Sequence, residues 1–132
     1  MGQKVHPHGF RVGFMKDWDT RWVASRKDIA AYIKEDDMLR KHLKKKLYLA
    51  GISRIEIERN TQRVTVNIHA GKPGIIIGKG GQGVELIKKE VEKLTKKSCN
   101  INIIEVKNVD ADAQLVAENI ASQLERRISF RL

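Results

Sequence analysis

Cysteine, proline and aromatic residues are scarce in this sequence, which has one Cys, two Pro and 5% aromatic residues among 132. The single Cys99 excludes an intramolecular disulfide and a zinc site made of several thiolates. Low cysteine usage is typical of the reducing cytoplasm, where we expect this protein. No apolar run reaches the roughly 20 residues that cross a bilayer, and the N-terminus lacks the apolar segment of a secretory signal. We therefore expect no membrane partner.

Positive charge is what the sequence has in excess. Twenty-six Lys and Arg against sixteen Asp and Glu give a net charge of +10 and an isoelectric point of about 9.9. So strong a positive field on a small protein favours a polyanionic partner such as nucleic acid. A basic surface that only confers solubility is the alternative. An anionic membrane would need a basic helix with an exposed bulky apolar face, and we interpret the apolar stripes as facing the core.

Residues 1–27 form a basic, irregular arm. Its cations include Lys4 and Arg11, and Trp18 and Trp22 lie within it. An arm of this composition cannot bury itself, so it docks on the rest of the chain or becomes ordered on a partner. We interpret the two tryptophans as anchors of the arm, with base stacking as the alternative.

Apolar periodicity predicts the remaining elements. Ser25 and Asp28 resemble a helix start, Asp36 and Asp37 resemble a second one, and Gly51 ends this helical segment. The further expected elements are strands at 54–58, 63–69 and 99–106, a helix from residue 84, and a last helix after Asp110 and Asp112. This order predicts an α+β fold, a three-stranded sheet with helices on one face. We divide the chain into the arm (1–27), this domain (28–109) and a C-terminal helical region (110–132).

A glycine-rich stretch at 73–84, PGIIIGKGGQGV, has three interpretations. A nucleotide phosphate loop fails, because Pro73 stands where the Walker motif needs a glycine and Gly80 where it needs a hydroxyl. Gly78, Gly80 and Gly83 satisfy the dinucleotide fingerprint. In that fold, however, a buried parallel strand leads directly into the glycines, whereas here an alternating strand ends several residues earlier.

The third interpretation is the G-x-x-G loop of a KH domain, which residues 78–81 fit. Pro73 can begin a short helix over residues 75–77, and the loop then enters the helix near Val84. Glycines let the backbone N–H groups approach a phosphate, and the helix N-terminus favours its negative charge. A tight helical turn that needs glycine only for its geometry is the alternative.

A set of residues is therefore predicted to bind RNA. The loop would hold phosphates, three isoleucines would form an apolar floor for unstacked bases, and the basic residues would add contacts that salt weakens. The candidate RNA-binding residues are Gly78, Lys79, Gly80, Gly81, Lys72, Ile75, Ile76, Ile77, Lys88, Lys89, Lys4, Arg11, Arg126, Arg127 and Arg131.

Matching segments run in order along nearly the whole chain. They are GQKVHP (2–7) with GFRVG (9–13), KPGIIIGKGG (72–81), and AQLVA (113–117) followed by QLERR (123–127). In these segments the sequence resembles the N-terminal, KH-domain portion of the uS3 family of bacterial small-subunit ribosomal proteins. The resemblance implies a type II KH domain, in which a helix and two strands precede the G-x-x-G unit.

The same resemblance implies a function and partners. It implies a structural constituent of the small ribosomal subunit that binds rRNA, in the subunit head near the entrance of the mRNA channel. Neighbouring head proteins would be partners, and mRNA is a further candidate. An isolated KH module that binds single-stranded RNA off the ribosome is the alternative, but such a module would not need the family's N-terminal signature.

The C-terminal end departs from the family pattern. Members of the family continue into a further α/β domain that this sequence does not contain, and truncation would explain its absence. Arg131 matches one of the family residues linked to mRNA unwinding, whereas Leu132 departs from the next. We therefore do not extend the unwinding role to this chain.

Other chemistry is not indicated. His6 and His8 could ligate a metal, but no further ligand lies near them in sequence, and we interpret them as facing solvent or RNA. The acidic residues at 36–37 and at 110 and 112 are interpreted as helix starts rather than acid/base pairs. No nucleophile and base are suitably arranged. We expect no enzymatic activity, no cofactor, no metal and no small-molecule substrate.

Overall fold

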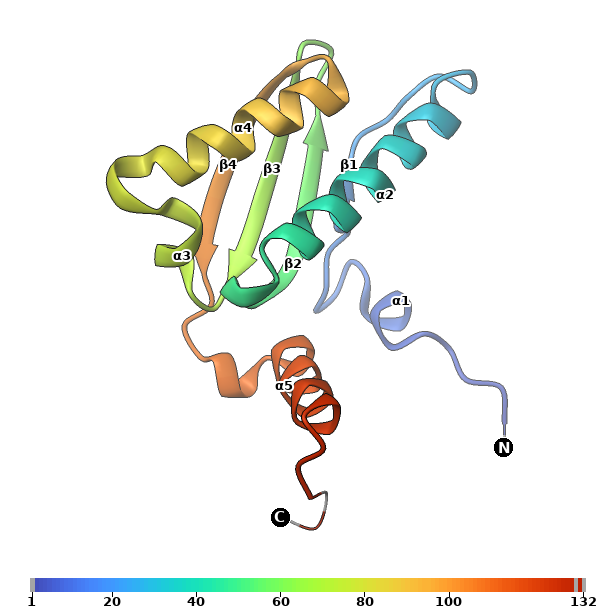
Figure 1. Ribbon diagram of the computed structural model, residues 1–132. Coiled ribbons are helices and arrows are strands. Elements are labelled where there is room, and N and C mark those ends of the chain that lie inside the picture. Colours follow the sequence, from blue (N-terminus) through green and yellow to red (C-terminus); the bar gives the residue numbers. More distant parts are fainter. Residues whose placement is uncertain (1, 130, 132) are drawn as a thin grey trace.

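A layer of helices covers one face of a small sheet in the computed structural model, which describes residues 2–129 and 131 (Figure 1). The elements in chain order are α1 (Pro7–Arg11), β1 (Thr20–Arg21), α2 (Ile29–Lys46), η1 (Tyr48–Ala50), β2 (Ile52–Arg59), β3 (Arg63–Ala70), α3 (Pro73–Ile77), η2 (Lys79–Gly81), α4 (Gln82–Thr95), β4 (Ser98–Glu105), η3 (Val109–Ala111) and α5 (Ala113–Glu125). Leu132, which departs from the family pattern, lies outside the described residues. The predicted α+β fold is confirmed.

The sheet has four strands in the order β1-β2-β3-β4. β2 and β3 form an antiparallel hairpin, in which the N–H of Asn60 donates to the carbonyl oxygen of Arg63 at 2.9 Å. β3 and β4 are parallel and are connected through α3 and α4. The predicted number of three strands is wrong, because Thr20–Arg21 of the arm pairs with Ile57 and Glu58 at the edge. A strand of two residues is too short to show an alternating pattern.

The core lies between the sheet and the helices α2 and α4. In β3, Val64, Val66 and Ile68 point inward and are fully buried, as the alternating pattern predicts. The other large core side chains are Leu39, Leu43, Leu47, Ile52, Ile55, Ile57, Ile76, Ile87 and Val91. Cys99 is 2% exposed on the inward side of β4, and burial raises the pKa of its thiol. It is a core residue rather than a nucleophile.

Asp36 is the centre of a buried polar cluster. Its carboxylate accepts hydrogen bonds from the Arg59 guanidinium at 2.5 and 3.0 Å and from the Trp22 indole N–H at 2.7 Å. α2 runs unbroken through this position, so the predicted helix start at Asp36 and Asp37 is wrong. Aspartate is common at helix starts, but a buried carboxylate with an arginine partner is stable inside a helix.

The two tryptophans of the arm differ in their surroundings. The Trp22 ring meets Tyr32 edge-on, with 5.5 Å between ring centroids, and Arg59 lies 4.9 Å from the centroid of the same Tyr32 ring. The interpretation as an anchor is therefore confirmed for Trp22. Trp18 is 65% exposed and anchors nothing comparable.

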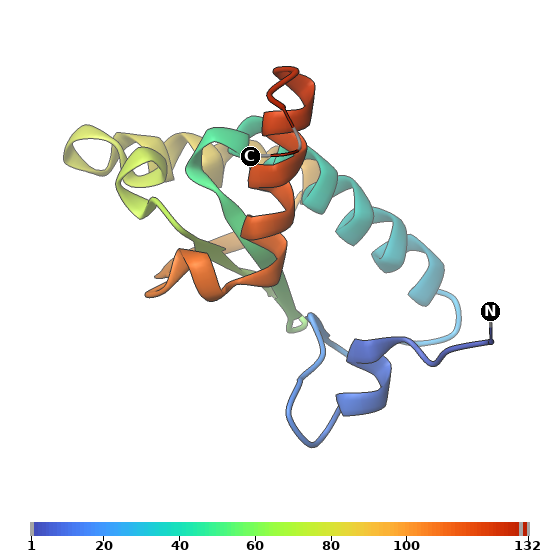
Figure 2. The ribbon, with the colours of Figure 1, turned by 90° about the horizontal axis from the view of Figure 1, so that it is seen from below.

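α5 lies outside the helical layer, below the sheet in Figure 1, and Figure 2 shows it from the side. Asp112 begins it as predicted: its carboxylate accepts from the N–H of Leu115 at 3.1 Å and from the Ser53 hydroxyl at 2.6 Å. Burial raises the pKa of Asp112, but these hydrogen bonds outweigh burial and leave the pKa lowered. The expectation that the apolar stripes face the core is wrong for α5, where Ile120 and Leu124 are more than half exposed.

Removing the carboxylate of Asp36 tests the buried cluster. Asp36→Ala leaves the guanidinium of Arg59 buried without its main partner, which typically costs about 3–5 kcal/mol of the free energy of unfolding. Asp37→Ala is the matched control, because Asp37 pairs with Lys41 on the surface at 2.7 Å and such pairs contribute about 0–1 kcal/mol. Urea denaturation would measure both variants, and equal losses would contradict a special role for the buried pair.

Candidate nucleic-acid interface

The loop from Gly78 to Gly81 joins α3 to α4 at one end of the molecule (Figure 1). Residues 78–80 are exposed and residue 81 is half-buried. Gly80 and Gly81 both have left-handed backbone conformations, with φ of 64° and 77°, which side chains rarely adopt. The N–H of Gln82, the first of α4, donates to the carbonyl oxygen of Lys79, whereas the next N–H groups of the first turn have no partner inside the helix. Loop and helix start thus present backbone donors at an accessible surface.

Gly83 determines how closely α4 approaches α3. A Cβ atom at this position would lie 3.0 Å from the carbonyl oxygen of Ile77 and closer still to that of Ile76. No side chain fits there, so the two helices could not meet at the present distance with any other residue. In the sequence, Gly83 figured only in the rejected dinucleotide fingerprint. Its steric role depends on contacts between two helices, which a spacing pattern does not reveal.

The three isoleucines before the loop do not share one role. Ile76 is 1% exposed and belongs to the core, so it cannot contact a ligand. Ile75 and Ile77 are 55% and 41% exposed beside the loop. The predicted apolar floor is therefore corrected to Ile75 and Ile77, because a short helix turns its middle residue toward the core.

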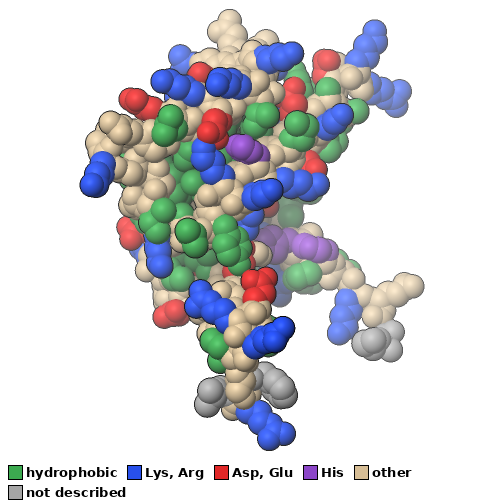
Figure 3. Space-filling view, viewed as in Figure 1, with side chains coloured by type: hydrophobic (Ala, Val, Ile, Leu, Met, Phe, Trp, Pro, Cys, Tyr) green, Lys and Arg blue, Asp and Glu red, His purple; other side chains and the backbone are tan. Residues whose placement is uncertain are grey.

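Exposed lysines lie in the loop and on the segments that precede and follow it. Lys79 lies in it, Lys72 precedes α3, and Lys88 and Lys89 follow along α4. Within the described part of the chain, none of the four forms an ion pair. Figure 3 shows Lys and Arg side chains spread over the surface of the helical layer. This face therefore keeps positive charge that an anion could neutralise.

Glu90 offsets part of this charge where α4 meets α2. Its carboxylate accepts from the ammonium of Lys46 and lies 3.1 Å from the imidazole of His42. The hydrogen bonds from Lys46 and then from His42 lower the pKa of Glu90. Lys46 is thus engaged between helices, and it is a weaker candidate for an external anion than the lysines beside the loop.

The remaining candidate residues lie elsewhere. Lys4 and Arg11 are in the arm, which extends away from the loop in both ribbon views (Figures 1 and 2). Arg11 donates to the carbonyl oxygen of Pro7 at 3.0 Å. Arg126, Arg127 and Arg131 follow α5. Lys79 lies in the loop, and Lys88 and Lys89 lie on the helix that the loop enters, whereas Lys72 lines a separate pocket together with Arg126. The arm is a further separate basic segment.

Two other features concern metals and membranes. Among residues 2–129 and 131, no group of three or more His, Cys, Asp or Glu side chains is placed to hold a metal ion. No described helix combines the length and apolar character needed to cross a membrane. His6 has a local role, because its Nδ1 accepts from the backbone N–H of His8 at 3.2 Å at the start of α1.

Comparison with known proteins identifies relatives. A family model described as "KH domain" matches residues 38–111. "Small ribosomal subunit protein uS3" of Alkaliphilus oremlandii is 60% identical over 132 residues, which cover 99% of this chain and 56% of that protein. The protein of the same name from Caldicellulosiruptor bescii is 61% identical over 132 residues, which cover 99% of this chain and 60% of that protein. The resemblance to the uS3 family is confirmed, and the chain spans somewhat more than half the length of these relatives.

The close approach at Gly83 can be tested by adding one methyl group. We expect Gly83→Ala to lower the free energy of unfolding by about 1–3 kcal/mol, because the methyl group meets backbone carbonyls that cannot move aside. Gly74→Ala in α3 is the control: its Cβ would meet nothing within 4 Å, and alanine favours a helix by about 1 kcal/mol. Thermal or urea denaturation would compare them, and a tolerated Gly83→Ala would contradict the steric role.

The lowered pKa of Glu90 predicts a pH dependence. A carboxyl whose pKa is lowered by folding contributes its full stabilisation at pH values above its ordinary pKa, which is 4.5 for Glu90. This stabilisation is lost as the pH falls through the lowered pKa of the folded state. We expect Glu90→Gln to weaken the acid-induced loss of stability. Glu85→Gln, an exposed residue of the same helix, is the control. Urea denaturation at a series of acidic pH values measures the effect, and identical pH profiles for the two variants would refute it.

Proposed function

Because this chain belongs to the KH domain family, we propose that it binds single-stranded segments of RNA through the G-x-x-G loop and the start of α4. The observation that carries the proposal is the loop itself. It is exposed, two consecutive residues in it have left-handed backbones, and it opens onto a helix N-terminus. Backbone N–H groups and the helix dipole at such a place favour phosphate.

In this mechanism the backbone, rather than any side chain, makes the closest contacts. A phosphate would lie against the N–H groups of Gly80, Gly81 and the first turn of α4. Lys79 would add a mobile cation, and Lys88 or Lys89 would meet the next phosphates along the helix. The exposed sides of Ile75 and Ile77 would lie beneath unstacked bases. Sequence preference would come from the bases, and affinity mainly from the phosphates.

The names of the relatives support a proposal about the biological setting. Proteins about 60% identical to this chain are named as small ribosomal subunit proteins. We propose that the chain is a structural, non-catalytic constituent of the small ribosomal subunit in the cytoplasm, with rRNA as its main partner. We further propose a place in the subunit head near the entrance of the mRNA channel, beside other head proteins. Lys4, Arg11 and the three C-terminal arginines would add salt-sensitive contacts to phosphate.

Two negative charges placed in the loop test this function. We expect Lys79→Asp combined with Gly80→Asp to weaken binding of a short oligouridylate by at least tenfold, because the carboxylates repel phosphate and Asp at position 80 is strained. The slope of the logarithm of the binding constant against the logarithm of the salt concentration should become shallower by about 0.7 for each phosphate that the loop no longer binds. Fluorescence anisotropy across a salt series measures both quantities.

An exposed segment elsewhere in the chain provides the control. Lys107→Asp with Asn108→Asp changes the net charge in the segment between β4 and η3 by the same amount. This variant should bind nearly as tightly as the unchanged protein. Equal losses in both double variants would mean that only net charge matters, and that the loop does not clamp RNA.

A further inference from the structure

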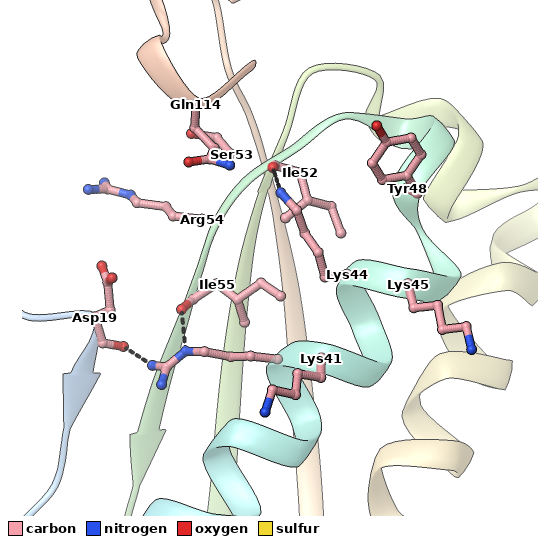
Figure 4. A pocket seen from close by; sticks show the side chains of 11 residues that line it. Asp19, Lys41, Lys44, Lys45, Tyr48, Ile52, Ser53, Arg54, Ile55 and Gln114 are labelled. Carbon is pink, nitrogen blue, oxygen red and sulfur yellow. Dashed lines mark hydrogen bonds between the residues drawn. The ribbon is translucent and has the colours of Figure 1, made fainter. Parts of the chain in front are cut away.

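A groove between α2 and the edge of β2 lies apart from the G-x-x-G loop (Figure 4). Its volume is about 540 Å³, within the usual range of ligand pockets. Of the eleven residues that line it, five are Lys or Arg and one is Asp. Asp19 from the arm stands at one end and Gln114 from α5 at the other, so segments far apart in the sequence assemble it.

The carbon stems of two basic side chains, Arg40 and Lys44, form an apolar floor for this groove. The Arg40 guanidinium donates to the carbonyl oxygens of Ile55 at 3.4 Å and Asp19 at 3.1 Å. The Lys44 ammonium donates to the carbonyl oxygen of Ile52 at 2.6 Å and also pairs with Glu118 of α5. Because both heads donate to carbonyl oxygens of β2, the methylene stems extend from α2 toward β2, where Ile52 and Ile55 are buried. Figure 4 shows this course for the stem of Lys44. The floor is therefore carbon-lined, with the two charged heads fixed at its margin.

The same hydrogen bonds disfavour an extended peptide as the ligand. Among the described residues, β1 pairs only with Ile57 and Glu58, which leaves Ile52–Ile55 as a strand edge facing the groove. A peptide adds to such an edge by forming main-chain hydrogen bonds. Here the carbonyl oxygens of Ile52 and Ile55 already accept from side chains. The groove thus offers an apolar surface rather than the hydrogen bonds of a strand.

The rim of the groove suits an anion beside a flat ring. Lys45 is exposed and forms no ion pair within the described part of the chain. Among residues 2–129 and 131, Lys41 pairs only with Asp37, one turn earlier on the surface of α2. Tyr48, 46% exposed, stands on the same side as Lys45 (Figure 4). An aromatic ring next to mobile cations is the combination that binds a base and its phosphate.

We propose that this groove is a second site for single-stranded RNA, which takes one nucleotide. The base stacks against Tyr48 and the stems of Arg40 and Lys44, and its phosphate lies between Lys45 and Lys41. This inference rests on the proposed RNA-binding function and deepens it, because RNA would be held at two separate points. The acidic side chains of a peptide could match the charge of the rim, but they have no planar ring to cover the floor.

Crosslinking and affinity measurements on the whole chain test the site. The probe is an oligouridylate of about ten nucleotides, longer than the four or so that a KH loop holds, with 4-thiouridine for crosslinking. We expect an adduct on the peptide that contains Tyr48, in addition to one near the loop. The Tyr48 adduct should persist in the Lys79→Asp, Gly80→Asp variant, whose loop no longer binds.

Substitutions in the groove provide the second measurement. Lys45→Gln with Tyr48→Leu should weaken binding roughly tenfold, as expected when a base no longer stacks and its phosphate no longer meets a cation. Lys34 is an exposed lysine of α2 outside the groove. Lys34→Gln also removes one positive charge and should have little effect on RNA affinity. Tyr48→Phe keeps the ring and should bind as the unchanged protein does. Circular dichroism would verify that each variant is folded.

The outcomes separate this inference from the proposed function. Adducts near the loop without any on Tyr48, or equal affinity of the groove variant and Lys34→Gln, would overturn the second site and leave the loop intact as a clamp. Displacement of the RNA from the groove by polyglutamate at equal charge concentration would identify an acidic-peptide site instead, and overturn the inference. Absence of adducts from both surfaces would overturn both proposals.

Discussion

Arg59 reaches from the end of β2 to Asp36 in the middle of α2, and both side chains are 4% exposed. An ion pair in so dry a place is stable only if its hydrogen-bonding groups find partners. The Glu35 carboxylate accepts from one nitrogen of the Arg59 guanidinium at 2.9 Å, and the indole N–H of Trp22 donates to the second carboxylate oxygen of Asp36. The pair therefore fixes α2 against the sheet, and through Trp22 it also fixes the arm. The arm can then pair with β2 through β1 and place Asp19 at one end of the groove between α2 and β2.

The proposed RNA-binding surface depends on this arrangement in a different way. α4 and α2 form the helical layer over one face of the sheet, and the exposed lysines point from this layer into solvent. The loop that leads into α4 stands at its end because Gly83 allows α3 and α4 to touch backbone to backbone. In the proposed function, affinity for phosphate would come from donors that the fold holds in place, which would spare the entropy of ordering long side chains. The lysines would add long-range attraction.

Several features could be predicted from residues alone, because they depend on local periodicity. The alternation of Val64, Val66 and Ile68 was sufficient for the hairpin and its inward face, and the glycines at 78–81 were sufficient for the loop. Asp36 was misread because a cap and a buried ion-pair partner share the same residue type. Ile76 was misassigned to the surface because residues 75–77 are alike, and only packing against the core distinguishes them. The RNA-binding residues themselves stay predictions.

The sequence by itself determined the α+β fold, the G-x-x-G loop and the excess of positive charge, since each is a property of neighbouring residues or of composition. The tertiary structure alone decided which charges are engaged: Arg59 is buried, Arg40 and Lys44 donate to the edge of β2, and Lys45 forms no ion pair with the described residues. It also added the fourth strand and assembled a groove from the arm, α2, β2 and α5. These outcomes depend on contacts between residues far apart in the chain, whose energies no local pattern encodes.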